Sequence, residues 1–178
     1  MSNTPVEFTS FAELEQAAKN GDAKAQFMLG KAYYEGQHVP QKTAEAFSWW
    51  KRAAEQGLAE AKLALGVAYY YGLGVRQNCD LAAHWLQEAA GQGIAEAQCN
   101  LGIVYSRGHG LPQDDTQAML WFRKAAEQGF PQAQRILGDA YRDGRSVPQD
   151  FTQAESWYRI AAEQGDADAK ESLAALKG

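Results

Sequence analysis

Small and apolar residues recur along the chain at a helical spacing. In the stretch 57–92, Ala61, Leu65, Ala68 and Tyr69 follow one another at steps of three and four, as on one face of an α-helix. Gly72 then predicts the end of this first helix, because glycine is favoured just past a helix end. A second helix is predicted from about Cys79 to Gly91, with one apolar face made of Ala82, Trp85, Leu86, Ala89 and Ala90.

This pair of helices repeats with a constant period of 36 residues. Shifting the sequence by one period superimposes the same residue types, as in Trp49, Trp85, Trp121 and Trp157. Four full repeats are predicted, at residues 21–56, 57–92, 93–128 and 129–164. A fixed period in this range is typical of a stacked array, in which each unit contacts only its neighbours.

The two ends of the chain differ from the repeats. Ser10 and Glu13 form a capping-box pattern, which predicts a capping helix within 10–20 after a loose segment at 1–9. Residues 165–178 match the first helix of a repeat and predict a C-terminal capping helix. The predicted fold is therefore all-α, an α/α solenoid of about ten helices that forms one continuous domain.

Four glycines stand inside predicted helices, at Gly30, Gly66, Gly102 and Gly138. Glycine in a helix costs about 1 kcal/mol relative to alanine. We interpret these glycines as sites where the second helix of each repeat approaches closely. The recurring tryptophan is predicted to lie over the gap and to form a ladder of core rings.

The repeat resembles the Sel-one-like repeat (SLR) family, a relative of the tetratricopeptide repeats. Its pattern is A-x-A-x-x-x-L-G-x-x-Y, then G-x-G-V, then A-x-x-W-[YF]-x-x-A-A-x-x-G. The second repeat supplies Ala59, Ala61, Leu65, Gly66, Tyr69, Gly72, Gly74, Val75, Ala82, Trp85, Ala89, Ala90 and Gly93. Leu86 stands where an aromatic residue is usual, and Gln37 and Arg145 are interpreted as replacing the second loop glycine. The resemblance implies a right-handed superhelix that acts as an adaptor or scaffold for other proteins.

Charge and composition exclude several functional classes. The net charge of −5 and the pI of about 5.2 argue against a general nucleic-acid binder and give no attraction to an anionic membrane. The N-terminus has no signal-peptide pattern, and Cys79 and Cys99 are poorly placed to form a disulfide. These features favour the cytoplasm, or the periplasm or a secreted location if an upstream signal has been removed.

No motif indicates catalysis, a cofactor or a metal. His38, His84 and His109 are scattered, without a partner at helical spacing that could share a metal ion. Gly72-Leu-Gly74 follows a helix and not a strand, so it is a turn rather than a dinucleotide loop. We therefore predict a chain that is not an enzyme and holds no cofactor. A cysteine-rich branch of the SLR family has hydrolase-like members, so a cell-envelope regulator or hydrolase-like protein is an alternative.

A partner-binding surface is predicted from the positions that vary between repeats. In tetratricopeptide-like arrays the first helix of each repeat lines the concave wall. An apolar and aromatic stripe with a basic end is expected there, made of Phe27, Tyr34, Leu63, Val67, Tyr70, Tyr71, Ile103, Arg107, Arg135 and Arg142. Such a stripe suits a partner's peptide or helix, with tyrosines as anchors. Two alternatives stay open. In the first, some of these side chains pack against the neighbouring helix of the array. In the second, the chain is a structural subunit that self-associates through the stripe rather than a monomer.

Overall fold

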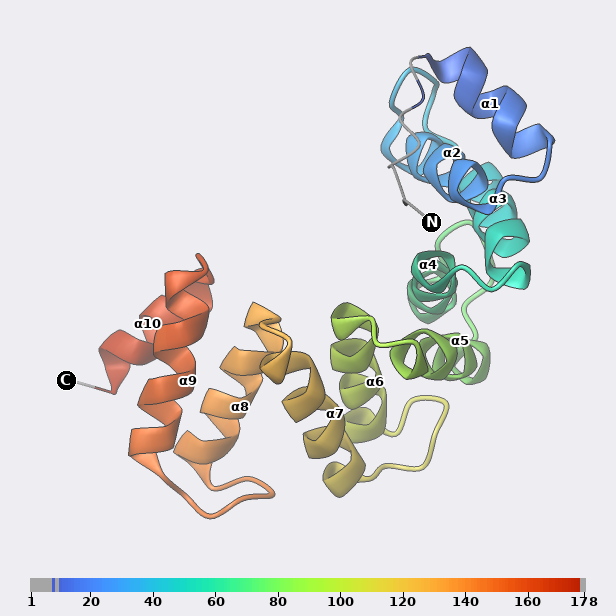
Figure 1. Ribbon diagram of the computed structural model, residues 1–178. Coiled ribbons are helices and arrows are strands. Elements are labelled where there is room, and N and C mark those ends of the chain that lie inside the picture. Colours follow the sequence, from blue (N-terminus) through green and yellow to red (C-terminus); the bar gives the residue numbers. More distant parts are fainter. Residues whose placement is uncertain (1–7, 9, 177–178) are drawn as a thin grey trace, which may run out of the picture. The chain divides into compact units, whose positions relative to one another are not determined.

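The computed structural model describes residue 8 and residues 10–176, and this part of the chain is entirely helical, without a strand (Figure 1). Ten helices follow in order: α1 (Phe11–Lys19), α2 (Ala23–Glu35), α3 (Thr43–Glu55), α4 (Ala59–Tyr71), α5 (Cys79–Gly91), α6 (Ala95–Arg107), α7 (Asp115–Glu127), α8 (Pro131–Asp143), α9 (Phe151–Glu163) and α10 (Ala167–Ala175). The all-α prediction is confirmed. The predicted loose segment at 1–9 lies outside the described residues, apart from Phe8.

The helices form two compact units, Met1–Trp85 and Leu86–Gly178, and the division falls within α5. In the first unit each helix from α1 to α4 packs on the next one along the chain. In the second unit the same holds from α6 to α10, and α6, α7 and α8 lie side by side (Figure 1). The predicted repeat boundaries and the single continuous domain stay predictions.

Local hydrogen bonds determine where the helices begin. The Ser10 side chain accepts a hydrogen bond from the backbone N–H of Glu13, and Asp114 and Asp150 cap α7 and α9 in the same way. Lys42, at the equivalent place before α3, makes no side-chain cap. The cap predicted at Ser10 is confirmed, and α5 has the bounds that its pattern predicts.

The loops that follow α2, α4, α6 and α8, the first helix of each repeat, correct one detail of the sequence interpretation. Gly74 and Gly110 have positive φ angles of 69° and 83°. Their equivalents in the other two loops are His38 and Ser146, with φ angles of 62° and 59°. The interpretation that Gln37 and Arg145 replace the second glycine is therefore wrong by one position. The left-handed conformation persists at both non-glycine residues, so all four loops keep the same turn.

The helix glycines do mark close helix contacts, but the ring above each one is not the recurring tryptophan. A Cβ added to Gly30 would lie 2.5 Å from Cδ1 of Trp50, and one added to Gly138 would lie 2.5 Å from Cε1 of Tyr158. Both rings belong to the residue that follows the recurring tryptophan, and both are buried. The predicted position of the tryptophan over the gap is wrong.

The recurring tryptophans are half-buried and face another direction. Trp49 packs against the core of α1 and α2, which includes Leu14 and Leu29. Trp157 packs in the same way against the core of α7 and α8. Successive helix positions differ by about 100° in direction, so two adjacent side chains contact different neighbours. One residue binds a helix to its own repeat, and the other binds it to the core of the preceding helices.

A buried glutamine network, absent from the sequence prediction, connects the ends of the second helices. Gln98 is 6% exposed; its amide donates to the backbone oxygen of Ala90, and its side-chain oxygen accepts from Gln128 at 2.8 Å. Gln26 and Gln134 make the equivalent bonds. A buried side-chain amide needs such partners, because an unpaired one costs about 1–3 kcal/mol.

Candidate functional site

The apolar part of the predicted stripe lies on α2 and α4 of the first unit. Phe27 and Tyr34 pack against the core formed by α3 and α4, and the Tyr34 ring centroid lies 5.4 Å from that of Trp50. Both side chains are therefore partly core. For these two residues, the alternative that they pack against neighbouring helices therefore holds. Leu63 and Val67 are half-buried on α4.

Tyr70 and Tyr71 end α4 and differ in exposure. Tyr71 is 67% exposed, and its ring meets the half-buried ring of Tyr70 edge to face at 5.0 Å. The repeat itself uses the preceding residue, Tyr69, whose ring packs edge to face on Phe47 at 5.2 Å. The helix therefore ends in an aromatic pair beyond the tyrosine that every repeat carries.

The remaining predicted residues lie on α6 and α8 of the second unit. Ile103 packs against the core of α7 and α8. Arg135 lies 3.5–3.7 Å from carboxylate oxygens of Asp139, Asp166 and Asp168. The basic end of the stripe is therefore largely paired with acidic side chains, which were not part of the sequence prediction.

Arg142 belongs to a second charged group at the end of α8. It donates to both carboxylate oxygens of Asp143, at 2.7 and 3.2 Å, and Arg145 also donates to this carboxylate. These hydrogen bonds hold the pKa of Asp143 at about 2 and raise that of Arg142. Asp143 and Arg142 therefore keep their charges throughout the neutral pH range.

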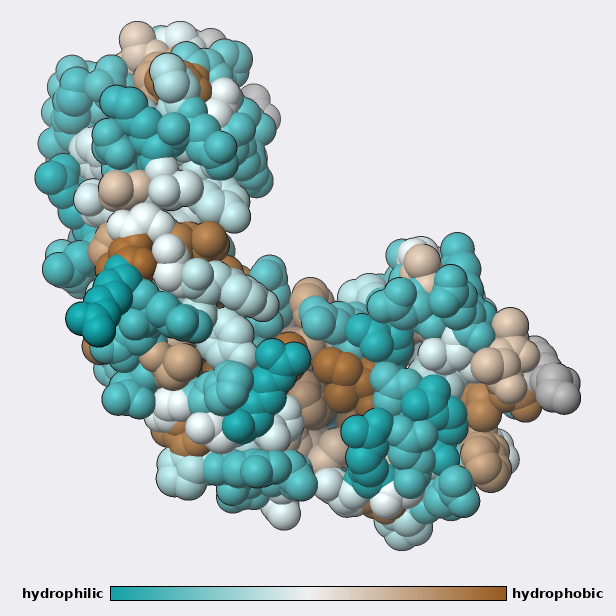
Figure 2. Space-filling view, turned by 180° about the vertical axis from the view of Figure 1, so that it is seen from behind, coloured by the Kyte–Doolittle hydropathy of each residue, from teal (hydrophilic) through white to brown (hydrophobic). Residues whose placement is uncertain are grey.

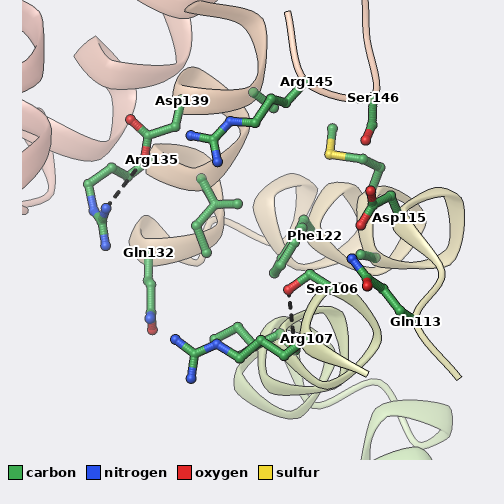
Figure 3. A pocket seen from close by; sticks show the side chains of 15 residues that line it. Ser106, Arg107, Gln113, Asp115, Phe122, Gln132, Arg135, Asp139, Arg145 and Ser146 are labelled. Carbon is green, nitrogen blue, oxygen red and sulfur yellow. Dashed lines mark hydrogen bonds and ion pairs between the residues drawn. The ribbon is translucent and has the colours of Figure 1, made fainter. Parts of the chain in front are cut away.

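A pocket of about 630 Å³ lies among α6, α7 and α8, entirely within the second unit (Figure 3). Its apolar wall is formed by buried Phe122 and by the half-buried side chains of Ile103, Met119 and Ile136. Its polar residues come from the end of α6, the start of α7, α8 and the following loop: Ser106, Arg107, Gln113, Asp115, Gln132, Arg135, Asp139, Arg145 and Ser146. On this unit's surface, hydrophobic side chains lie between hydrophilic ones (Figure 2).

The polar side chains of the pocket form two groups (Figure 3). Arg107, Gln132 and Arg135 lie on one side of Phe122, and Asp115 and Ser146 lie on the other. The volume is within the range of about 300–1,000 Å³ that is typical of ligand sites. An apolar wall with polar groups around it suits the binding of a side chain or a short peptide segment.

Sequence analysis found only part of this pocket. It named Ile103, Arg107 and Arg135, which line the pocket, but it missed Phe122 and Ser106. A signal for Ser106 exists, because the equivalent residues in the first two repeats are Tyr34 and Tyr70. A small residue at a position where two other repeats carry an aromatic side chain indicates space that the protein itself does not fill.

The described residues give no sign of a metal centre, since no group of three or more His, Cys, Asp or Glu side chains in this part could hold an ion. Cys79 and Cys99 are both free thiols. Cys99 is fully buried, and burial raises its pKa to about 12. This thiol has a packing role within the second unit.

Alkylation should distinguish the two cysteines. At pH 8 a thiol with a pKa of about 12 is roughly one part in 10,000 thiolate, and Cys99 is fully buried whereas Cys79 is half-buried. Iodoacetamide should therefore label Cys79 at least ~100-fold faster than Cys99 in the folded protein. Peptide mass spectrometry measures both rates, and urea should equalise them. Equal labelling without urea would contradict the burial of Cys99.

These features define a class: a protein of repeated helical hairpins, in which the recurring small and aromatic residues build the core. The chain belongs to the Sel1 repeat family, whose model matches residues 23–58, 59–94, 95–130 and 131–166. Sel1 repeat proteins generally act as protein-interaction scaffolds. The resemblance to the SLR family and the predicted solenoid fold are confirmed.

Solved structures agree with this assignment. A protective antigen of uropathogenic Escherichia coli with an SLR fold is 40% identical, with a TM-score of 0.87 over 93% of this chain and 36% of that protein. A Sel1 repeat protein from Oxalobacter formigenes is 32% identical, with a TM-score of 0.89 over 94% of this chain and 66% of that protein. An immunity protein from Pseudomonas aeruginosa, 21% identical with a TM-score of 0.61 over 89% of this chain and 58% of that protein, shares the fold.

This chain thus spans about a third of the length of the E. coli antigen and 66% of the Oxalobacter protein. No curated protein matched the chain significantly. In the described part of the chain, no helix combines the length and the apolar character needed to cross a membrane. The predicted cytoplasmic location stays a prediction.

Proposed function

We propose that this chain is a non-catalytic protein-interaction scaffold that binds a peptide or helix of a partner protein on the faces of α2, α4, α6 and α8. The observation that carries the proposal is the aromatic pair at the end of α4. Tyr71 is 67% exposed and Tyr70 half-buried, while Tyr69 already supplies the ring that the repeat packs on Phe47. Aromatic surface beyond the needs of the fold is typical of an interaction site.

The chemistry of the pair suits an anchor. A tyrosine offers a large contact area with few rotamers to restrict, together with a hydroxyl group that can be hydrogen-bonded. Leu63 and Val67 lie on the same helix and would extend the apolar contact. In the second unit, the partner would also contact Ile103, Arg107, Arg135 and Arg142.

The double variant Tyr70→Ala, Tyr71→Ala tests this proposal. Central aromatic anchors cost about 2 kcal/mol or more on truncation, which is roughly 30-fold in affinity. The partner would be isolated from the source cells by affinity pull-down, purified, and titrated by calorimetry against each variant. We expect binding at least ~30-fold weaker, with a melting temperature close to that of the wild type.

Two variants serve as controls. Phe151→Ala removes a similarly exposed aromatic residue, 56% exposed, from the start of α9, a second helix, and should bind normally. Tyr69→Ala should lose stability first, because its ring packs on Phe47. Normal binding by the double variant together with weak binding by Phe151→Ala would place the site on the second helices and refute the proposal.

A further inference from the structure

The pocket in the second unit occupies a place that a tyrosine fills in the first unit. Two repeat periods, 72 residues, relate α2, α3 and α4 to α6, α7 and α8. In the first unit the Tyr34 ring lies 5.4 Å from the Trp50 ring and packs against the core. Ser106 and Phe122 are the equivalents of these two residues, and both line the pocket.

Ser106 cannot fill this space. Its side chain is short, and its hydroxyl donates to the backbone oxygen of Ile103 at 3.0 Å, which holds it against its own helix. The wall behind it is apolar, because Met119 and Phe122 stand where the first unit has Phe47 and Trp50. The second unit therefore keeps the aromatic wall and lacks the ring that covers it.

The loop after α8 also leaves the pocket open. In the first unit, Gly74 packs so closely on the start of α3 that an added Cβ would overlap the backbone carbonyl of Thr43. In the second unit the equivalents are Ser146 and Asp115, and both line the pocket instead. The loop after α4 therefore closes against α3 in the first unit, whereas the equivalent loop after α8 borders the pocket in the second unit.

The charged residues beside the pocket are paired with one another. Arg135 replaces Leu63 of the first unit, and its buried Nε has no hydrogen-bond partner. Its carboxylate neighbours lie at 3.5–3.7 Å, longer than good hydrogen bonds. Asp139 already accepts a hydrogen bond from Tyr158 at 2.7 Å and pairs with Arg142. This side of the pocket thus holds one arginine among three carboxylates and offers no net positive charge to an anion, so the feature of the pocket left open is its apolar wall.

We propose that this pocket receives an aromatic side chain of a partner protein. The ring would lie against Phe122 as the Tyr34 ring lies against Trp50. This inference rests on the proposed function, for which it specifies the chemistry of one contact.

Blocked tetrapeptides are suitable probes. The ¹⁵N-labelled full chain would be titrated with acetyl-Gly-Tyr-Gly-Gly-amide, and with a peptide in which alanine replaces the tyrosine. The first peptide should shift the amide signals of Ser106, Phe122 and Arg135. The alanine peptide should bind about 30-fold more weakly, as expected for loss of an anchor in a pocket. Equal binding of the alanine peptide, or shifts confined to other helices, would overturn the proposal.

Variants of Ser106 test the site directly. Ser106→Tyr restores the ring of the first unit and should block the pocket, so that the tyrosine peptide no longer shifts these signals. Ser106→Ala keeps the space open and should bind as the wild type does. If Ser106→Tyr does not fold, Ser106→Leu fills the same space with a smaller side chain. Undiminished binding by a folded, filled variant would contradict the assignment.

The Tyr70→Ala, Tyr71→Ala double variant separates this proposal from the proposed function. The Tyr70, Tyr71 variant should bind these peptides normally, because its substitutions lie in the first unit. Loss of peptide binding at the pocket and loss of partner binding at Tyr70 and Tyr71 are therefore separate outcomes.

Discussion

Gly74→Ala is expected to lower the free energy of unfolding by about 2–4 kcal/mol, although it adds a single methyl group. Two costs combine. The φ angle of 69° is left-handed, and an alanine there costs about 1–2 kcal/mol. The new Cβ would also overlap the Thr43 carbonyl, a backbone atom at the start of α3, so the loop or the helix must move. Urea unfolding followed by circular dichroism measures the change.

Gly57→Ala is the matched control. Gly57 also has a positive φ, of 94°, but an added Cβ would meet no atom within 4 Å. It should therefore lose only the conformational part, about 1–2 kcal/mol. Equal losses in the two variants would show that the packing of Gly74 on Thr43 contributes nothing.

Gly102→Val should destabilise the second unit by about 2–3 kcal/mol. An added Cβ would lie 2.6 Å from Cε1 of Phe122, and the valine methyl groups would press further into this ring. Because Phe122 is 5% exposed and surrounded by the core of α7 and α8, it has little room to turn away. Thermal unfolding should show a lower melting temperature and less cooperativity, since stability in repeat arrays is shared between neighbouring units.

A double-mutant cycle identifies the cause. Phe122→Leu alone loses packing, but it should relieve the overlap when it is combined with Gly102→Val. The second repeat already pairs a helix glycine with leucine at these positions, Gly66 and Leu86. The two substitutions together should cost clearly less than the sum of the single effects. Strict additivity would show that the ring is not what excludes a side chain at Gly102.

The pocket illustrates how far the sequence prediction of the site could go. Ile103, Arg107 and Arg135 were found because they stand at positions that vary from repeat to repeat, within a pattern that is otherwise constant. The sequence could not show that Arg135 lies beside Asp166 and Asp168, which stand at the start of α10. Nor could it show that Tyr34 turns toward Trp50, since a tyrosine on that face of a helix can equally face solvent.

Local chemistry in the sequence determined the helices themselves. The period of 36 residues is visible in the sequence itself. The caps at Ser10, Asp114 and Asp150 are contacts between residues two or three positions apart. Such contacts do not depend on what the helix later packs against. The sequence pattern alone was therefore enough for the fold class and for the family.

Only the tertiary structure decided which neighbour each side chain meets. Trp49 and Trp50 are adjacent and chemically identical, yet Trp50 lies on Gly30 while Trp49 packs on the core of α1 and α2. The difference is a rotation of about 100° around one helix, and it has meaning only once the neighbouring helices are in place. The pocket beside Ser106 arises in the same way, because a missing side chain leaves a cavity only where three packed helices surround it.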